Sequence, residues 1–228
     1  MKTDAPVITI DGPSGTGKGT LSQLLATKLQ WHLLDSGAMY RVLALAALDS
    51  DIDLDDELQL AQLALELDIN FTPDQNTGVP SIQLAGAEVS ERIREHEISE
   101  ASSRVAAHPP VRTALLDLQR AFRRAPGLVA DGRDMGSTVF PMADLKVFLT
   151  ASADARAQRR YKQLKTKEDG ASLRALREDL AKRDQRDMTR TASPLRPADD
   201  ALIIDSTEMS IEQVLERLLD AVKQRGLC

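Results

Sequence analysis

The chain has 228 residues, of which 42% are hydrophobic and 28% charged, a composition typical of a globular protein with enough length for a full core. Its single cysteine, Cys228, excludes an internal disulfide framework and a Cys/His metal cluster, and it favours a reducing compartment. The net charge of −6 argues against a surface that binds nucleic acid. The sequence shows no signal peptide and no apolar run of the ~18–20 residues needed to cross a bilayer. We therefore expect a cytoplasmic protein without membrane contacts.

Short apolar runs rich in β-branched residues alternate with helical patterns along the chain. Strands are predicted over residues 7–10, 33–35, 128–130, 145–149 and 201–204. Leucines and alanines at helical spacing predict helices over residues 19–30, 38–47 and 211–222, with Ser210 as the N-cap of the last. This order predicts an α/β fold with a five-stranded parallel sheet flanked by helices, which binds ligands at the carboxyl ends of its strands.

Two segments depart from this alternation. Residues 51–97 contain strand patterns at 69–72 and 81–84 joined by a turn-rich stretch at 73–78, which predicts a small antiparallel insert. Residues 154–190 are helical and rich in arginine, and they form a second candidate insert.

A glycine-rich turn follows the first strand and fits the P-loop pattern G-x-x-x-x-G-K. Glycines allow several backbone N–H groups to point into one concavity, and the following helix adds positive partial charge at its N-terminus. We therefore predict that the phosphates of ATP are bound by Gly12, Pro13, Ser14, Gly15, Thr16, Gly17, Lys18, Gly19 and Thr20. Gly19 stands where Ser or Thr usually binds Mg²⁺, so we expect Thr20 or waters to serve the metal.

Segment 15–20 resembles the nucleoside monophosphate kinases more than the motor or signalling P-loop proteins. Further segments are similar to the bacterial cytidylate kinases, and they occur in the family's order and spacing at residues 8–15, 34–41, 130–136 and 205–207. The resemblance extends from Val7 to about Leu219. It implies Mg²⁺-ATP as donor, CMP or dCMP as acceptor, partners limited to such small molecules, and a monomer.

The resemblance also implies a division of the chain into three functional regions. The P-loop core is expected over residues 1–36, 98–153 and 191–228. A monophosphate-binding region with the antiparallel insert is expected over 37–97, and a short helical lid over 154–190.

The acceptor carries a phosphate dianion that must be held in line with the γ-phosphate, and arginine suits this task because its planar fork matches phosphate oxygens. Arg41 and Arg133 each follow a predicted strand, and we predict that both clamp this phosphate. Asp134 can accept from the N4 amine of cytosine and would repel the oxygen at the same place in uracil. The resemblance adds Ser103 and Arg112 as donors to the base.

Two residues at strand ends have alternative roles that stay open. Ser36 can bind the acceptor or cap the helix that follows it. Asp131 can orient waters of Mg²⁺ or hold arginine side chains.

The arginine-rich segment contains Arg156 and Arg160, which lie four residues apart on one helix face with Arg159 adjacent. We predict that Arg156 and Arg160 contact the donor nucleotide. A solvated helix face is the alternative, above all for Arg159.

In the same segment an apolar stripe of leucines at 173, 176 and 180 continues, with the same steps, to Arg183 and Asp187, and Arg190 follows three residues later. A buried stripe that becomes charged should open into a polar cleft. The resemblance places Arg183 and Asp187 near the acceptor sugar and phosphates and Arg190 among the transferring phosphates. The alternative is a structural ion-pair network.

These expectations combine into direct in-line phosphoryl transfer without a covalent enzyme intermediate. Mg²⁺ and the cationic groups would stabilise the transferring phosphoryl, which gives the candidate catalytic residues Lys18, Arg133, Arg183 and Arg190. A P-loop kinase for another small acceptor, such as UMP, AMP or a non-nucleotide, is the nearest alternative. A nucleotide-binding switch without transferase activity is the other.

Overall fold

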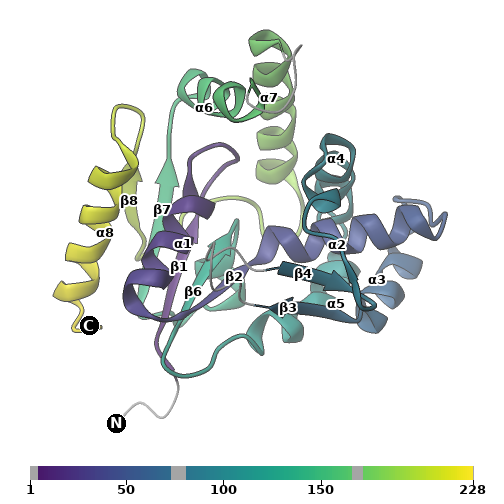
Figure 1. Ribbon diagram of the computed structural model, residues 1–228, viewed down its shortest axis with the longest axis horizontal. Coiled ribbons are helices and arrows are strands. Elements are labelled where there is room, and N and C mark those ends of the chain that lie inside the picture. Colours follow the sequence, from purple (N-terminus) through teal and green to yellow (C-terminus); the bar gives the residue numbers. More distant parts are fainter. Residues whose placement is uncertain (1–4, 73–80, 166–171, 228) are drawn as a thin grey trace. The chain divides into compact units, whose positions relative to one another are not determined.

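The computed structural model describes residues 5–72, 81–165 and 172–227 (Figure 1). The strands are β1 (Val7–Asp11), β2 (His32–Asp35), β3 (Ile69–Thr72), β4 (Ser81–Leu84), β5 (Ala87–Glu88), β6 (Leu128–Gly132), β7 (Leu145–Thr150) and β8 (Leu202–Asp205). The α-helices are α1 (Lys18–Leu29), α2 (Ser36–Asp49), α3 (Glu57–Glu66), α4 (His96–Val105), α5 (Pro109–Arg120), α6 (Ala153–Lys165), α7 (Leu173–Thr189) and α8 (Ile211–Gln224). Short helices of other types are η1 (Arg92–Arg94) and η2 (Met135–Val139), the latter a π-helix.

A five-stranded sheet in the order β2-β6-β1-β7-β8 confirms the predicted fold class. The central strand β1 is buried along its whole length and pairs in parallel with β6 on one side and β7 on the other. Its last residue, Asp11, lies opposite Gly132 of β6 and Phe148 of β7. Because the strands run the same way, their carboxyl ends meet at one edge of the sheet, where ligands of such folds bind.

The chain divides into two compact units, and the first comprises residues 1–33 and 123–228. Its core joins the sheet to α1 and α8, with Ile8, Leu25, Val147 and Leu218 among the buried side chains. As predicted, Ser210 caps α8, and it does so in a capping box with Gln213. None of the helices within the described ranges is long and apolar enough to span a bilayer.

Trp31 packs against the backbone of Gly127 within this first unit. A Cβ atom at position 127 would lie 2.3 Å from the indole ring, so a glycine is required there. The adjacent residue, His32, donates its backbone N–H to the Gly127 carbonyl at 2.9 Å.

The second unit, residues 34–122, is built mainly from helices. Leu43, Leu60, Ile93 and Leu115 belong to one buried cluster that joins its helices and its small sheet. That sheet, β3-β4-β5, is antiparallel as predicted, whereas the turn expected over 73–78 lies outside the described residues.

Two features of this unit differ from the sequence expectation. The insert over residues 51–97 also contains α3, whose first turn is capped by the Asp56 side chain. Helix α5 and most of α4 fall in the stretch 98–153 that we expected in the P-loop core. Both helices belong to the second unit, because α4 packs on α2 and α5 on α3. The division by function stays a prediction.

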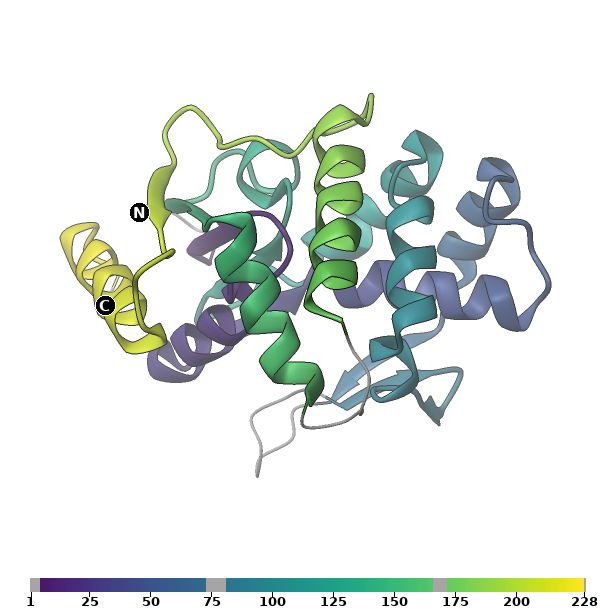
Figure 2. The same cartoon turned by 90° about the horizontal axis from the view of Figure 1, so that it is seen from above.

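Most of the described residues within 154–190 are helical, and α6 and α7 lie side by side (Figure 2). The expected buried stripe along α7 is wrong for its first turns, since Leu173 is 43% exposed. Burial begins at Leu180 and reaches Asp187. In Figure 1 the start of α7 stands clear of the five-stranded sheet.

Candidate active site

The P-loop connects β1 to α1 in the first unit and requires glycine at two positions. Gly12 has a φ of 152°, and a Cβ there would lie 2.0 Å from the Leu149 carbonyl oxygen. Gly15 has a φ of 80°, in the left-handed region that glycine adopts without strain. Gly17, the N-cap of α1, makes no side-chain cap, which leaves the first amides of the helix to bind an anion.

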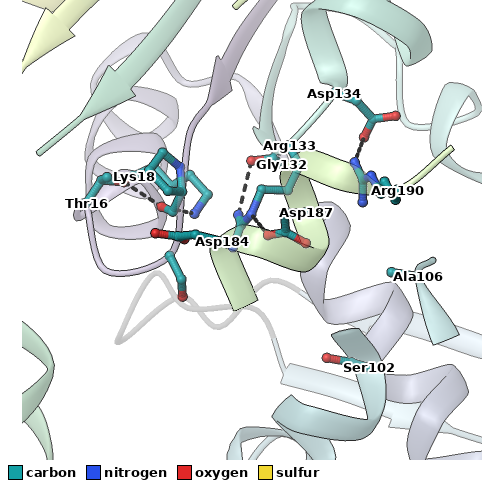
Figure 3. A network of polar contacts seen from close by, with 12 residues as sticks. Thr16, Lys18, Ser102, Ala106, Gly132, Arg133, Asp134, Asp184, Asp187 and Arg190 are labelled. Atoms are coloured by element: carbon teal, nitrogen blue, oxygen red, sulfur yellow. Dashed lines mark hydrogen bonds and ion pairs between the residues drawn. The ribbon is translucent and has the colours of Figure 1, made fainter. Parts of the chain in front are cut away.

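Lys18 is buried against the loop, where its Nζ atom donates to the Pro13 carbonyl at 3.3 Å (Figure 3). Burial is the largest cause that lowers the pKa of Lys18 to about 7. The nearby Arg133 and Arg183 act in the same direction, and Asp131 and Asp187 oppose them. Phosphates bound in the loop would add negative charge and favour the protonated lysine.

Two arginines of α6 bind backbone carbonyls of the P-loop. Arg156 is buried and donates to the Ser14 carbonyl at 3.0 Å, while its other end forms an ion pair with Asp184 of α7 at 2.7 Å. Arg159 donates to the Thr16 carbonyl at 3.2 Å and to Ser206. These bonds orient the peptide planes of the loop, so α6 supports the phosphate cradle.

Sequence reasoning missed this supporting role of Arg159, because its spacing is equally consistent with a solvated helix face. The predicted nucleotide contacts of Arg156 and Arg160 stay predictions. The spacing places Arg156 and Arg159 on one helix face, but it does not show which carbonyls that face contacts.

A second basic group lies in the same unit, around α7 and the end of β6. Arg133 donates its Nε–H to Asp187 at 2.9 Å and a further N–H to the Gly132 carbonyl at 3.2 Å (Figure 3). Arg190 approaches Asp134 at 3.8 Å, and both side chains are only 4% exposed. Burial opposes the charge of Asp187, but Arg133, Arg183 and Arg190 outweigh it and lower its pKa.

The structure therefore brings several predicted residues of the first unit together. Lys18, Arg133, Arg183 and Asp187 lie close enough to shift one another's pKa. The P-loop thus has a cluster of arginines beside its lysine, a charge distribution that suits two adjoining phosphate groups.

The second unit carries the remaining candidates, beginning with the turn into α2. The Asp35 side chain accepts from the Ala38 amide at 2.9 Å and is the N-cap, so the capping role considered for Ser36 is wrong. Ser36 is the first residue of α2 and is buried. Asp35 also accepts from Arg41 at 2.9 Å, which orients that guanidinium.

Ser103 and Arg112 lie on α4 and α5 of this unit. The Ser103 hydroxyl is buried and has no hydrogen-bond partner within the described part of the chain. Its neighbour Ser102 donates to the Ser99 carbonyl at 2.8 Å, so the structure distinguishes two serines that spacing left equivalent. Arg112 donates to the Ala106 carbonyl at 3.1 Å and lies over the Tyr40 ring, 5.6 Å from its centroid.

The fold and this site define a P-loop phosphotransferase, with an anion cradle at the end of β1 and arginines beside its lysine. Comparison with known proteins identifies the family: the family described as cytidylate kinase matches residues 8–224, and the chain belongs to it. It is therefore an enzyme of the nucleoside monophosphate kinase class.

Individual relatives match over nearly their whole length. The cytidylate kinase of Aeromonas hydrophila is 56% identical over 225 residues, which cover 99% of this chain and 97% of that protein. The cytidylate kinase of Pseudomonas fluorescens is 54% identical and covers 100% of this chain and 99% of its own. A solved thymidylate kinase from Candida albicans is 14% identical with a TM-score of 0.42, covering 98% of this chain and 93% of that one.

Proposed function

We propose that this enzyme transfers the γ-phosphoryl group of ATP to CMP or dCMP. Its family and the relatives named cytidylate kinase support ATP-dependent phosphorylation of CMP. The structural observation that carries the proposal is the arginine cluster beside Lys18, because a protein that only binds one nucleotide has no need of a second anion site.

The donor phosphates bind in the P-loop, where backbone amides of residues 12–20 and the start of α1 face them. Lys18 reaches the β- and γ-phosphates. Arg156 and Arg159 keep the cradle in shape through the carbonyls of Ser14 and Thr16. Arg156 and Arg160 are our candidates for contact with the nucleotide itself.

Arg41 and Arg133 are our candidates for holding the acceptor phosphate. Arg41 is oriented by Asp35, and Arg133 by Asp187. Arg183 and Arg190 lie on and directly after α7, where they stabilise the charge of the transferring phosphoryl. The attacking oxygen belongs to a phosphate that is already anionic, so the reaction needs no general base, and catalysis rests on alignment and charge stabilisation.

Cytosine is recognised by its pattern of donors and acceptors. We assign Ser103 and Arg112 as donors to the ring and Asp134 as the acceptor for the N4 amine. The buried hydroxyl of Ser103 supports this role, since a buried polar group without a partner costs free energy unless a ligand binds it. Ser36 and Asp187 complete the acceptor site as proposed contacts of the phosphate and sugar.

The residues present fit a Mg²⁺ ion at the P-loop, and its charge would neutralise that of the nucleotide phosphates. A Cβ at Gly19 would lie 3.3 Å from Oδ2 of Asp131, so a carboxylate borders the place that Ser or Thr usually fills. No group of three His, Cys, Asp or Glu that could hold a metal occurs in residues 5–72, 81–165 and 172–227, which suits an ion bound mainly by phosphates and waters. We propose that Thr20 holds the ion and that Asp131 faces its waters. The enzyme is further expected to act as a cytoplasmic monomer on small molecules alone.

The test is ADP formation from Mg²⁺-ATP with CMP, dCMP, UMP, AMP and GMP. Wild type should turn over CMP and dCMP well above the others, and Asp134→Ala should lose this preference. Ser103→Ala should raise KM for CMP about 10-fold, the effect of one lost buried hydrogen bond. Ser102→Ala is the matched control, because Ser102 is bonded within its own helix and should leave KM unchanged. A preference for UMP or AMP in the wild type would refute the cytosine assignment, and no turnover would refute the kinase.

A further inference from the structure

Asp11, the last residue of β1, has a buried carboxylate that the proposed mechanism does not use. Its side chain is directed at backbone amides more than 120 residues away in sequence, since Oδ1 accepts from the Met135 N–H and Oδ2 from the Gly136 N–H, each at 2.8 Å. Asp11 is only 6% exposed. A carboxylate so deeply buried is retained only where its hydrogen bonds compensate for the loss of water.

The backbone of Asp11 holds the same loop at its other end. Asp11 lies opposite Gly132 in the parallel pairing of β1 with β6. Only Arg133 and Asp134 lie between Gly132 and the amide of Met135. Asp11 therefore holds the chain on both sides of these two residues, through its backbone at Gly132 and through its side chain at Met135. Their backbone therefore has little freedom while both anchors are intact.

The segment after Asp134 also packs closely against β1, at Gly136. A Cβ at Gly136 would lie 2.7 Å from Oγ1 of Thr9, so the segment is seated with no space for a side chain. Burial raises the pKa of Asp11 to about 7 against the two amide bonds, with Asp134 and Asp131 adding repulsion. An uncharged side chain of the same size at position 11, such as asparagine, would avoid the cost of burying a charge. It would, however, provide only one acceptor oxygen for the two amides.

We propose that Asp11 is a positioning residue for the phosphoryl acceptor: it holds Arg133 and Asp134 in the orientation that CMP requires and touches no substrate itself. This inference rests on the proposed roles of Arg133 and Asp134 in binding CMP. It assigns the end of β1 two tasks, since the peptide after Asp11 begins the donor cradle while its side chain arranges the acceptor loop.

The test is Asp11→Asn, which keeps the size of the side chain but can accept from only one of the two amides. We expect kcat/KM for CMP to fall about 10- to 100-fold, because small displacements of positioning groups have effects of this size. KM for ATP should change less than about 3-fold, since the two bonds that are altered do not involve the P-loop. The amide proton resonances of Met135 and Gly136 should move upfield as their charged acceptor is lost.

Asp144→Asn is the matched control. The Asp144 carboxylate accepts from the Val7 N–H at 2.9 Å, a bond of the same kind at the opposite end of β1. It should affect stability while leaving KM for both substrates unchanged. If Asp11→Asn loses stability like the control but keeps wild-type kinetics with CMP, Asp11 has only a structural role and the inference is wrong.

The inference and the proposed function fail in different ways. If the wild type does not phosphorylate CMP, the proposed function is wrong. If the wild type phosphorylates CMP and Asp11→Asn does so equally well, only the inference is wrong. If Asp11→Asn does not fold, hydrogen exchange of the wild type replaces it. The Met135 and Gly136 amides should then exchange slowly with solvent, and more slowly still when CMP is added. Fast exchange at a rate that CMP does not change would overturn the inference.

Discussion

Replacing Asp187 by asparagine should destabilise the free enzyme much more than removing a carboxylate from an exposed ion pair. Asp187 accepts from Arg133 at 2.9 Å, with the two side chains 8% and 17% exposed. Without the carboxylate the Arg133 guanidinium stays charged in a largely buried place beside Lys18 and Arg183. Losing one partner of a buried pair typically costs ~3–5 kcal/mol, and the partial exposure of Arg133 favours the lower end.

A loss of about 3 kcal/mol corresponds to a decrease in Tm of roughly 6–12 °C for a chain of this size. Urea unfolding followed by far-UV circular dichroism at neutral pH measures it. The pKa of Asp187 is lowered in the folded state, so its contribution is present above the ordinary aspartate value of 3.8 and is lost as the pH falls through the lowered value.

Asp49→Asn provides the comparison, because Asp49 pairs with Arg92 at 2.8 Å and the two side chains are 47% and 54% exposed. Its removal should cost less than ~1 kcal/mol. Equal losses in the two variants would show that the environment of Asp187 is not the buried, positively charged one described above, and would refute the reasoning.

Three further predictions concern the cradle and the last helix. The Lys18 pKa is lowered from 10.5 to about 7, so between these pH values the unfolded chain binds more protons and the stability of the free protein should rise with pH. Urea titrations at several pH values should show that Lys18→Met lacks this rise in the free energy of unfolding. A rise retained by the variant would point to another group. Arg156→Lys loses the guanidinium that binds both the Ser14 carbonyl and Asp184. KM for ATP should therefore rise about 10-fold in steady-state assays. An unchanged KM would mean that the P-loop does not need this contact with Arg156. Ser210→Ala removes the capping box of α8 and should cost ~1 kcal/mol in thermal unfolding without changing activity, and a loss of activity would contradict a purely structural cap.

The sheet and the P-loop were predictable from sequence because both depend on local patterns. The strand before Gly12 is a β-branched apolar run, and the glycines that follow it are required by backbone geometry. Helix α3 escaped prediction because Leu58 and Leu65 are 73% and 68% exposed, which obscures the apolar face that would have indicated a helix.

The site was less accessible to such reasoning wherever a role depends on contacts distant in sequence. Spacing could not reveal that Asp11 binds amides near residue 135 or that Arg159 binds the Thr16 carbonyl. At the start of α2 the pattern allowed Ser36 as a cap, but Asp35 precedes it and accepts the helix amide instead. Local propensity leaves such choices open, and tertiary structure decides them.

The seating of Trp31 on Gly127 gives this enzyme an intrinsic fluorescent reporter. Trp31 is the only tryptophan in the chain, and it lies in the first compact unit. Its emission therefore follows the unfolding of that unit alone, whereas far-UV circular dichroism is dominated by helices of both. Coincident transitions from the two probes would show that the units unfold as one cooperative system, and separate transitions would give the stability of each unit without any label.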